Sequence, residues 1–163
     1  WLHPENAKAW MVLIAEELAG LDPENAETYR ANAQAGQAEI DAAAAETAAN
    51  IADLKSRHFI VFHDAYQYFE EAFGLEVLGA ISLGDANRPS PAQLVGIRDA
   101  AKEGNVACIF AEPQFNPGLV ATVAEGTGAG TAVLDPLGTG IETGPQFYPQ
   151  LLRSLGNAVA GCK

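Results

Sequence analysis

The chain has 163 residues, and 9 lysine and arginine residues against 21 aspartate and glutamate residues give it a formal net charge of −12. A chain of this length can bury a sizeable core, whereas a surface this acidic repels phosphate backbones and excludes nucleic acid as a partner. No apolar run approaches the roughly 20 residues that a membrane-spanning helix needs, so we expect a soluble domain.

A polar residue followed by proline marks the start of the first two predicted helices. His3-Pro4 begins one helix at the chain start, without the basic segment of a signal peptide, so we expect the chain to be a fragment of a mature protein. Asp22-Pro23 begins a second, alanine-rich helix that we expect to run to about Lys55. Its main apolar anchors are few, namely Tyr29, Ile40, Ala44, Ile51 and Leu54. We therefore expect this long helix to lie along a surface or to bridge two bodies.

From residue 58 onward, short β-branched or aromatic runs alternate with helical segments, which is typical of βαβ units and a parallel sheet. The predicted strands are 58–63, 77–81, 106–111 and 131–134, and the predicted helices are 65–73, 91–103, 117–125 and 145–160. The expected fold class is α/β, a three-layer lobe around a mostly parallel sheet of about four strands, preceded by a long linker helix. Residues 1–57 would form the N-terminal helix and the linker helix, and residues 58–163 would form the lobe.

Three of the predicted strands end in side chains that can bind a metal. The first ends in His63-Asp64, the third in Glu112 and the fourth in Asp135. Ligands of open parallel sheets bind beyond the carboxyl ends of the strands, so one imidazole and three carboxylates would share one edge. An imidazole among carboxylates suits zinc, whereas oxygen ligands alone favour calcium, magnesium or manganese. Simpler roles compete, with Asp64 as a helix cap, Glu112 orienting nearby backbone and Asp135 as a turn residue.

The other sequence features do not indicate catalysis. The glycine-rich segment Glu125–Gly130 follows a predicted helix and precedes a strand, so we expect a connector and no phosphate-binding loop. His3 and His58 are expected to be structural or to face solvent. Neither cysteine, Cys108 or Cys162, has a histidine nearby in sequence to activate it. Their positions in the sequence allow two interpretations, in which the cysteines are either buried thiols or one disulfide.

Four short phrases follow one another along the chain at these positions. They read Trp-Leu-His-Pro-Glu-Asn-Ala from residue 1, Val-Phe-His-Asp-Ala-Tyr-Gln-Tyr-Phe from 61, Phe-Ala-Glu-Pro-Gln-Phe from 110 and Leu-Asp-Pro-Leu-Gly from 134. In this order they resemble the zinc-specific, ZnuA-type solute-binding proteins of bacterial ABC importers. In that family one long helix joins two α/β lobes, and one metal ion lies in the cleft between them. The resemblance implies that this chain is the linker helix with the C-terminal lobe, without the N-terminal lobe.

The resemblance also assigns roles to three residues. His63 matches a zinc ligand, Asp135 matches an aspartate that ligates or closely flanks the metal, and Glu112 matches a motif glutamate near the site. A histidine at position 63, where the manganese branch has a glutamate, points to the zinc branch. A further histidine ligand would come from two positions before Trp1, outside this chain. His3 departs from the aspartate or serine usual in the first phrase, which alters a helix cap and no ligand.

The same resemblance implies a disulfide between Cys108 and Cys162, because the zinc branch often carries one at these places. A disulfide requires an oxidising compartment, here the bacterial periplasm. We therefore expect a non-enzymatic protein that captures zinc with high affinity and delivers it to the membrane permease of an ABC importer. Zinc is the transported ligand, and this chain alone would bind it weakly or not at all, because part of the ligand set is missing.

Two alternatives and one further expectation accompany this hypothesis. A receptor lobe of the adhesin type that binds manganese or another divalent metal is the first alternative, and a zinc hydrolase with an open coordination position is the second. The sequence has no His-Glu-x-x-His phrase, which disfavours the hydrolase. The face of the linker helix that lacks its lobe would favour a homodimer of this chain at high concentration.

Overall fold

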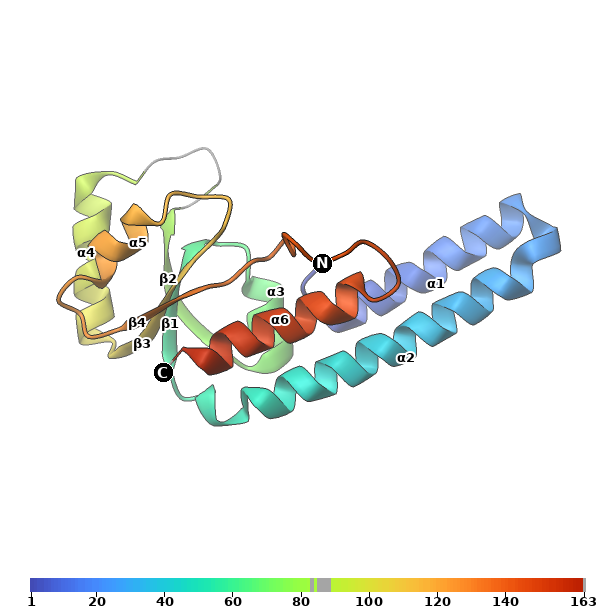
Figure 1. The fold of residues 1–163 in the computed structure, drawn as a ribbon, viewed down its shortest axis with the longest axis horizontal. Coiled ribbons are helices and arrows are strands. Elements are labelled where there is room, and N and C mark those ends of the chain that lie inside the picture. Colours follow the sequence, from blue (N-terminus) through green and yellow to red (C-terminus); the bar gives the residue numbers. More distant parts are fainter. Residues whose placement is uncertain (83, 85–88, 163) are drawn as a thin grey trace.

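Two antiparallel helices form an arm that extends from the α/β body in the computed structural model, which describes residues 1–82, 84 and 89–162 (Figure 1). Helix α1 is Pro4–Leu21 and helix α2 is Ala26–Asn50, with the short 3-10 turn Pro23–Asn25 between them. His3 Nδ1 accepts the backbone N–H of Glu5 at 3.2 Å, so His3 caps α1 in a structural role, as expected. None of the helices in the described part of the chain is long and apolar enough to cross a membrane.

Helix α2 is shorter than the sequence predicts, because a 3-10 turn lies at each end of it. The Asp22-Pro23 pair begins the first turn, and Ala52–Leu54 forms the second. Tyr29 is half-buried, and its hydroxyl donates to the Asp22 carboxylate at 2.8 Å, so this side chain fixes the turn and does not anchor the core. Ala44 is also only half-buried. The fully buried residues of α2 and the turn after it are Ala33, Ile40, Ala43, Thr47, Ile51 and Leu54.

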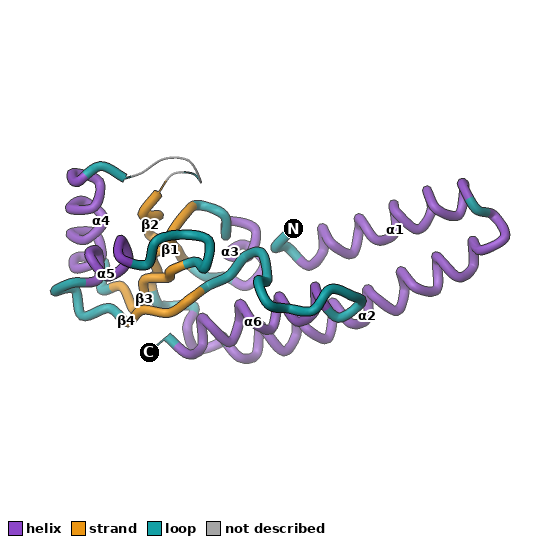
Figure 2. Tube along the Cα trace, turned by 45° about the horizontal axis from the view of Figure 1, so that its top comes forward, coloured by secondary structure: helices purple, strands orange, loops and turns teal. Residues whose placement is uncertain are grey.

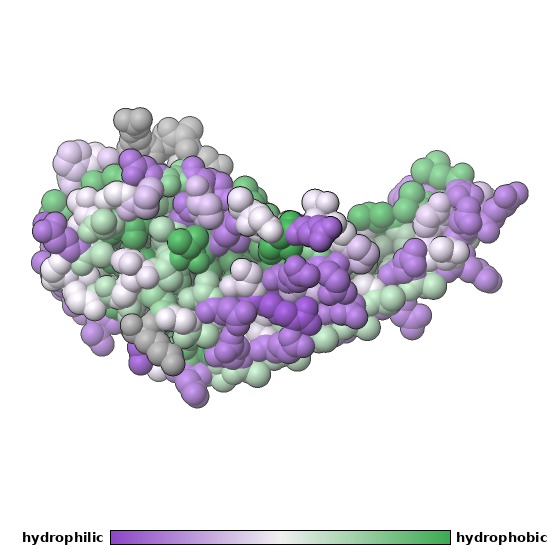
Figure 3. Space-filling view, viewed as in Figure 1, coloured by the Kyte–Doolittle hydropathy of each residue, from purple (hydrophilic) through white to green (hydrophobic). Residues whose placement is uncertain are grey.

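One face of α1 remains open to solvent on this arm. Leu13 and Leu21 are 64% and 81% exposed, and Ile14 is exposed as well. Figure 3 shows green, apolar patches along the upper side of the arm. Beside them lies a pocket of ≈ 310 Å³, lined by Met11, Ile14, Ala15, Leu18, Tyr29, Asn32 and Ala33. The α1–α2 arm therefore carries apolar surface that the other described residues leave exposed.

The body is a four-stranded parallel sheet in the order β2-β1-β3-β4. Its strands are β1 (His58–His63), β2 (Glu76–Ser82), β3 (Val106–Ala111) and β4 (Gly130–Val133), within one residue of the predicted bounds. Helices α4 (Pro91–Glu103) and α5 (Gly118–Ala124) cover one face. Helices α3 (Gln67–Phe73), α6 (Phe147–Gly161) and α2 cover the other (Figures 1 and 2). The predicted three-layer α/β fold is confirmed.

Residues of β1 alternate between the two cores. Phe59 and Val61 are buried with α2, α3 and α6, whereas Ile60 and Phe62 are buried with α4 and α5. A strand covered on both faces reads as a continuous apolar run, which is why the sequence located it. Since β1 pairs with β2 and β3, its last residue lies in the middle of the sheet edge.

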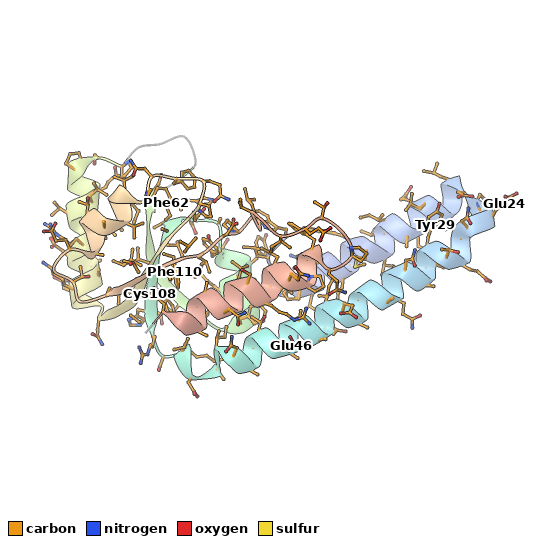
Figure 4. All side chains as sticks on the ribbon, in the orientation of Figure 1. Glu24, Tyr29, Glu46, Phe62, Cys108 and Phe110 are labelled. Carbon is orange, nitrogen blue, oxygen red and sulfur yellow. A yellow bond between two sulfur atoms is a disulfide. The ribbon has the colours of Figure 1, made fainter. Side chains whose placement is uncertain are left out.

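Helix α6 packs closely along the half of α2 nearest the sheet. The Thr47 hydroxyl donates to the carbonyl oxygen of Leu152 at 3.1 Å. Arg153 pairs with Glu46, which is labelled on α2 in Figure 4. A Cβ atom at position 156 would lie 2.8 Å from Thr47 Cγ2, so Gly156 allows the two helices to approach this closely. These contacts join the arm firmly to the body.

A disulfide links Cys108 on β3 to Cys162 just after α6, with Cα atoms 5.8 Å apart. Both residues are buried in the core on the α6 side of the sheet. The pairing that the family resemblance implied is confirmed. The bond closes a segment of 54 residues that includes half of the sheet and all of α6.

Candidate metal centre

His63 and Glu112 meet at the carboxyl edge of the sheet. His63 is the last residue of β1 and Glu112 follows β3, so the parallel pairing of these strands places them side by side. The Nδ1 atom of His63 lies 2.7 Å from Glu112 Oε1, and the backbone N–H of His63 donates to the same oxygen at 3.4 Å. The imidazole is 17% exposed and the carboxylate 1%. The Glu112 carboxylate therefore fixes the orientation of the His63 ring.

The electrostatics of this pair follow from its burial. Burial raises the pKa of Glu112 above its ordinary value, and the hydrogen bonds from His63 only partly offset that effect. A neutral imidazole that keeps its proton on Nδ1 presents Nε2 as the nitrogen that can bind a metal.

The pair lies at the base of a pocket of ≈ 300 Å³ whose wall is mostly apolar. The Phe115 ring stacks on Phe62 at a centroid distance of 4.4 Å and lies 5.5 Å from the His63 ring. The remaining lining residues are Trp1, Gln114, Pro136 and Leu137. Apolar walls exclude water and strengthen electrostatic interactions at the imidazole.

Asp135 lies in the turn after β4, and its carboxylate caps that turn. It accepts the backbone N–H groups of Leu137, at 3.0 Å, and Thr139, and the side-chain amide of Gln114 at 2.9 Å. Burial acts to raise the pKa of Asp135, but these hydrogen bonds outweigh it, so the pKa lies below its ordinary value. Asp135 does not line the pocket, and its role as a ligand stays a prediction. These contacts show Asp135 as a turn residue, which was the simpler role considered for it.

Two other residues considered in the sequence, Asp64 and His58, have clear positions. The prediction that Asp64 caps the following helix is wrong, because α3 begins at Gln67 with Tyr66 in the N-cap position and no side-chain cap. A separate turn, in which the Ala65 N–H donates to the His63 carbonyl oxygen at 2.9 Å, precedes it. His58 has a structural role, since its Nδ1 lies 2.8 Å from the carbonyl oxygen of Gly104.

Across residues 1–82, 84 and 89–162, no group of three or more histidine, cysteine, aspartate or glutamate side chains is arranged to hold a metal ion. The structure brings His63 and Glu112 into contact, and Gln114, which lines the same pocket, donates a hydrogen bond to Asp135. A complete four-ligand zinc site is therefore not formed by the described residues alone.

The sequence analysis missed two residues that shape this edge. The indole Nε1 of Trp1 donates to the carbonyl oxygen of Pro136 at 2.9 Å, and the Tyr66 hydroxyl donates to that of Leu134, also at 2.9 Å. Trp1 lies in the first of the four phrases, and Tyr66 lies in the phrase that contains His63. Membership of these phrases was the signal in the sequence that could have identified both residues. Their backbone partners could not be identified from residue types.

Comparison with known proteins gives one family. The family "Zinc-uptake complex component A periplasmic", ZnuA, matches residues 1–162. The chain is 46% identical over 162 residues to the "High-affinity zinc uptake system protein ZnuA" of Brucella abortus, which covers 99% of this chain and 48% of that protein. The chain therefore spans about half the length of the curated relatives that it matches.

Two solved structures are similar over the whole chain. A crystal structure of ZnuA has a TM-score of 0.84 and 33% identity, and the match covers 99% of this chain and 60% of that one. A mutant of the laminin-binding adhesin Lmb from Streptococcus agalactiae has a TM-score of 0.86 and 33% identity, with 100% of this chain and 62% of that one covered. Both similarities extend to the arm as well as to the α/β body, since nearly every residue is covered.

Proposed function

The chain belongs to the ZnuA family of periplasmic zinc-uptake components, and from this premise we propose that it captures zinc as the C-terminal lobe of a longer solute-binding protein. That protein would collect the metal in the periplasm and deliver it to the permease of an ABC importer, with zinc as cargo and without catalysis. Residues 1–57 would connect the lobes and residues 58–163 would form this lobe. The observation that carries the proposal is the His63–Glu112 pair at the base of an apolar pocket.

In this proposal His63 binds zinc through Nε2. Metal-binding histidines commonly donate their other ring N–H to a carboxylate, which fixes the tautomer and makes the ligand nitrogen more basic. The 2.7 Å contact between His63 Nδ1 and the buried Glu112 provides that arrangement. An imidazole ligand also favours zinc over manganese, which prefers oxygen ligands.

Asp135 would supply the second ligand. Its Oδ1 atom accepts the hydrogen bonds from Gln114 and Leu137, and Oδ2 accepts that from Thr139. An ionised carboxylate has about four lone-pair sites, so an oxygen can bind a metal while the turn is kept. The lowered pKa of Asp135 keeps it ionised at neutral pH, as a ligand must be.

The remaining ligands would come from the part of the longer protein that this chain does not contain. Zinc prefers four ligands, and with only two the other positions go to water, so this chain alone would bind zinc weakly. We propose that the open face of α1, including Leu13, Ile14 and Leu21, packs against that absent lobe. In the isolated chain the same face would favour a homodimer, which sedimentation over a range of concentrations would detect.

Calorimetric titration of this chain with zinc tests the proposal. Wild-type protein is expected to bind weakly, and His63→Ala is expected to lose the binding. His3→Ser is the matched control, because it removes a histidine outside the pocket and supplies a hydroxyl oxygen that can cap α1 in place of His3 Nδ1. Equal zinc binding by wild type and His63→Ala would contradict the proposal.

A further inference from the structure

Two aromatic side chains hold the backbone on both sides of Asp135. The Tyr66 hydroxyl donates to the carbonyl oxygen of Leu134 at 2.9 Å, and the indole Nε1 of Trp1 donates to that of Pro136 at 2.9 Å. Asp135 therefore lies between two carbonyl groups that are each fixed by a side chain distant in sequence.

The two donors are themselves held in different ways. Tyr66 is fully buried, three residues after His63 on the same segment, so its position follows that of the imidazole. Trp1 is 46% exposed, and packing alone does not fix its ring. Its backbone is fixed instead, because the Tyr148 hydroxyl donates to its carbonyl oxygen at 2.7 Å and the next residue, Leu2, is fully buried.

The hydrogen bond from Trp1 ends on Pro136, which precedes a pocket residue that is hydrogen-bonded to Asp135. Pro136 has no backbone N–H, so this residue can accept a hydrogen bond at its carbonyl oxygen but cannot donate one. Pro136 and Leu137 form part of the pocket wall, and the Leu137 N–H donates to the Asp135 carboxylate at 3.0 Å. If the Pro136 carbonyl were released, the Pro136–Leu137 peptide unit would lose the hydrogen bond at one of its two ends, and the pocket wall beside the Asp135 carboxylate would be held less firmly.

We propose that Trp1 is a positioning residue of the metal site, which holds the Pro136 carbonyl and so fixes Asp135 at the edge of the pocket that contains His63. Tyr66 holds the same segment from the other side. This inference rests on the proposed function, in which Asp135 and His63 both bind zinc. A segment already held in place loses less conformational freedom when the metal binds, so the two hydrogen bonds increase affinity without contacting the ion.

The two tryptophans of the chain provide a matched test. Trp1→Phe keeps an aromatic ring and removes the indole N–H, and Trp10→Phe makes the same change at a residue that is 47% exposed on α1. Losing one hydrogen bond that orders the site is expected to weaken zinc binding about fivefold. Trp10→Phe should bind like wild type.

Two measurements separate the outcomes. Zinc affinity is measured by competition of inorganic Zn²⁺ with a chelating dye, and the mobility of the segment by amide exchange at Leu137 and Thr139. The inference predicts faster exchange of these two amides in Trp1→Phe and unchanged exchange in Trp10→Phe. Unchanged exchange in Trp1→Phe would overturn it, and so would faster exchange with wild-type zinc affinity.

A parallel titration of His63→Ala distinguishes this inference from the proposed function. If His63→Ala loses zinc and Trp1→Phe does not change, the positioning role alone is refuted. If His63→Ala also binds like wild type, the proposed function fails, and the positioning role in zinc binding fails with it.

Discussion

Replacing Glu112 tests whether this buried carboxylate acts on the metal through His63. Glu112→Gln keeps the size of the side chain and an oxygen that can accept the Nδ1–H, but it removes the negative charge. Hydrogen bonds to charged groups contribute about 1.5–3 kcal/mol, and the 2.7 Å contact of Glu112, 1% exposed, belongs to this class. If about half of that energy depends on the charge, the change costs about 1 kcal/mol, or roughly fivefold in zinc affinity. Glu112→Leu, which also removes the acceptor, should weaken binding by about 10- to 100-fold.

The assay is competition of zinc between the protein and a chelating dye, with a melting curve for each variant. The control is Glu76→Gln, which neutralises the glutamate beside the other histidine of β1, since Glu76 Oε2 lies 3.4 Å from His58 Nε2. We expect that control to bind zinc like wild type. The reasoning would be refuted if Glu112→Gln and Glu112→Leu bound zinc as tightly as wild type, or if Glu76→Gln weakened binding equally.

Three further predictions follow from other parts of the structure. Reduction of the Cys108–Cys162 bond, which closes 54 residues, should lower the free energy of unfolding by about 4 kcal/mol in urea titrations, and a loss below about 1 kcal/mol would contradict this. His63→Glu should shift the preference of the site from zinc toward manganese in paired titrations, and an unchanged zinc preference would count against His63 as a ligand. Hydrogen bonds from Asn25 and Tyr29 hold the pKa of Asp22 below its usual 3.8, so its contribution to stability is complete above that pH and is lost as the pH falls through the lowered value. The protection of amides in the turn between α1 and α2, taken relative to the intrinsic exchange rate at each pH, should therefore fall in acid, and Asp22→Asn should remove that pH dependence.

Much of the fold could be predicted because the chain marks its elements with local signals. The strand 58–63 was located without error, since alternate residues are buried in two different cores. Pro4 and Pro91 begin helices as predicted. Pro23, Pro117 and Pro145 precede their α-helices by one to three residues, because a proline without an N–H fits a preceding turn as well as a first helical position.

The site was only partly predictable for a different reason. The rule that places ligands at the carboxyl ends of parallel strands was enough to expect His63 near Glu112. The cap assigned to Asp64 failed because a separate turn intervenes before α3. The bonds from Trp1 and Tyr66 end on backbone carbonyl oxygens, which every residue has, so no pattern of side chains reveals them. The cysteine pairing came from the family resemblance alone.

The close packing of α2 against α6 gives the arm a mechanical property. With 25 residues, α2 is about 38 Å long, and the half that contains Glu46 and Thr47 packs against α6 while the other half lies beside α1. A helix fixed at one end acts as a rigid lever, so a rotation of about 5° at the contact with α6 would move its far end by about 2 Å. A push at the tip of the arm would therefore tilt the whole sheet, and with it the edge that carries His63.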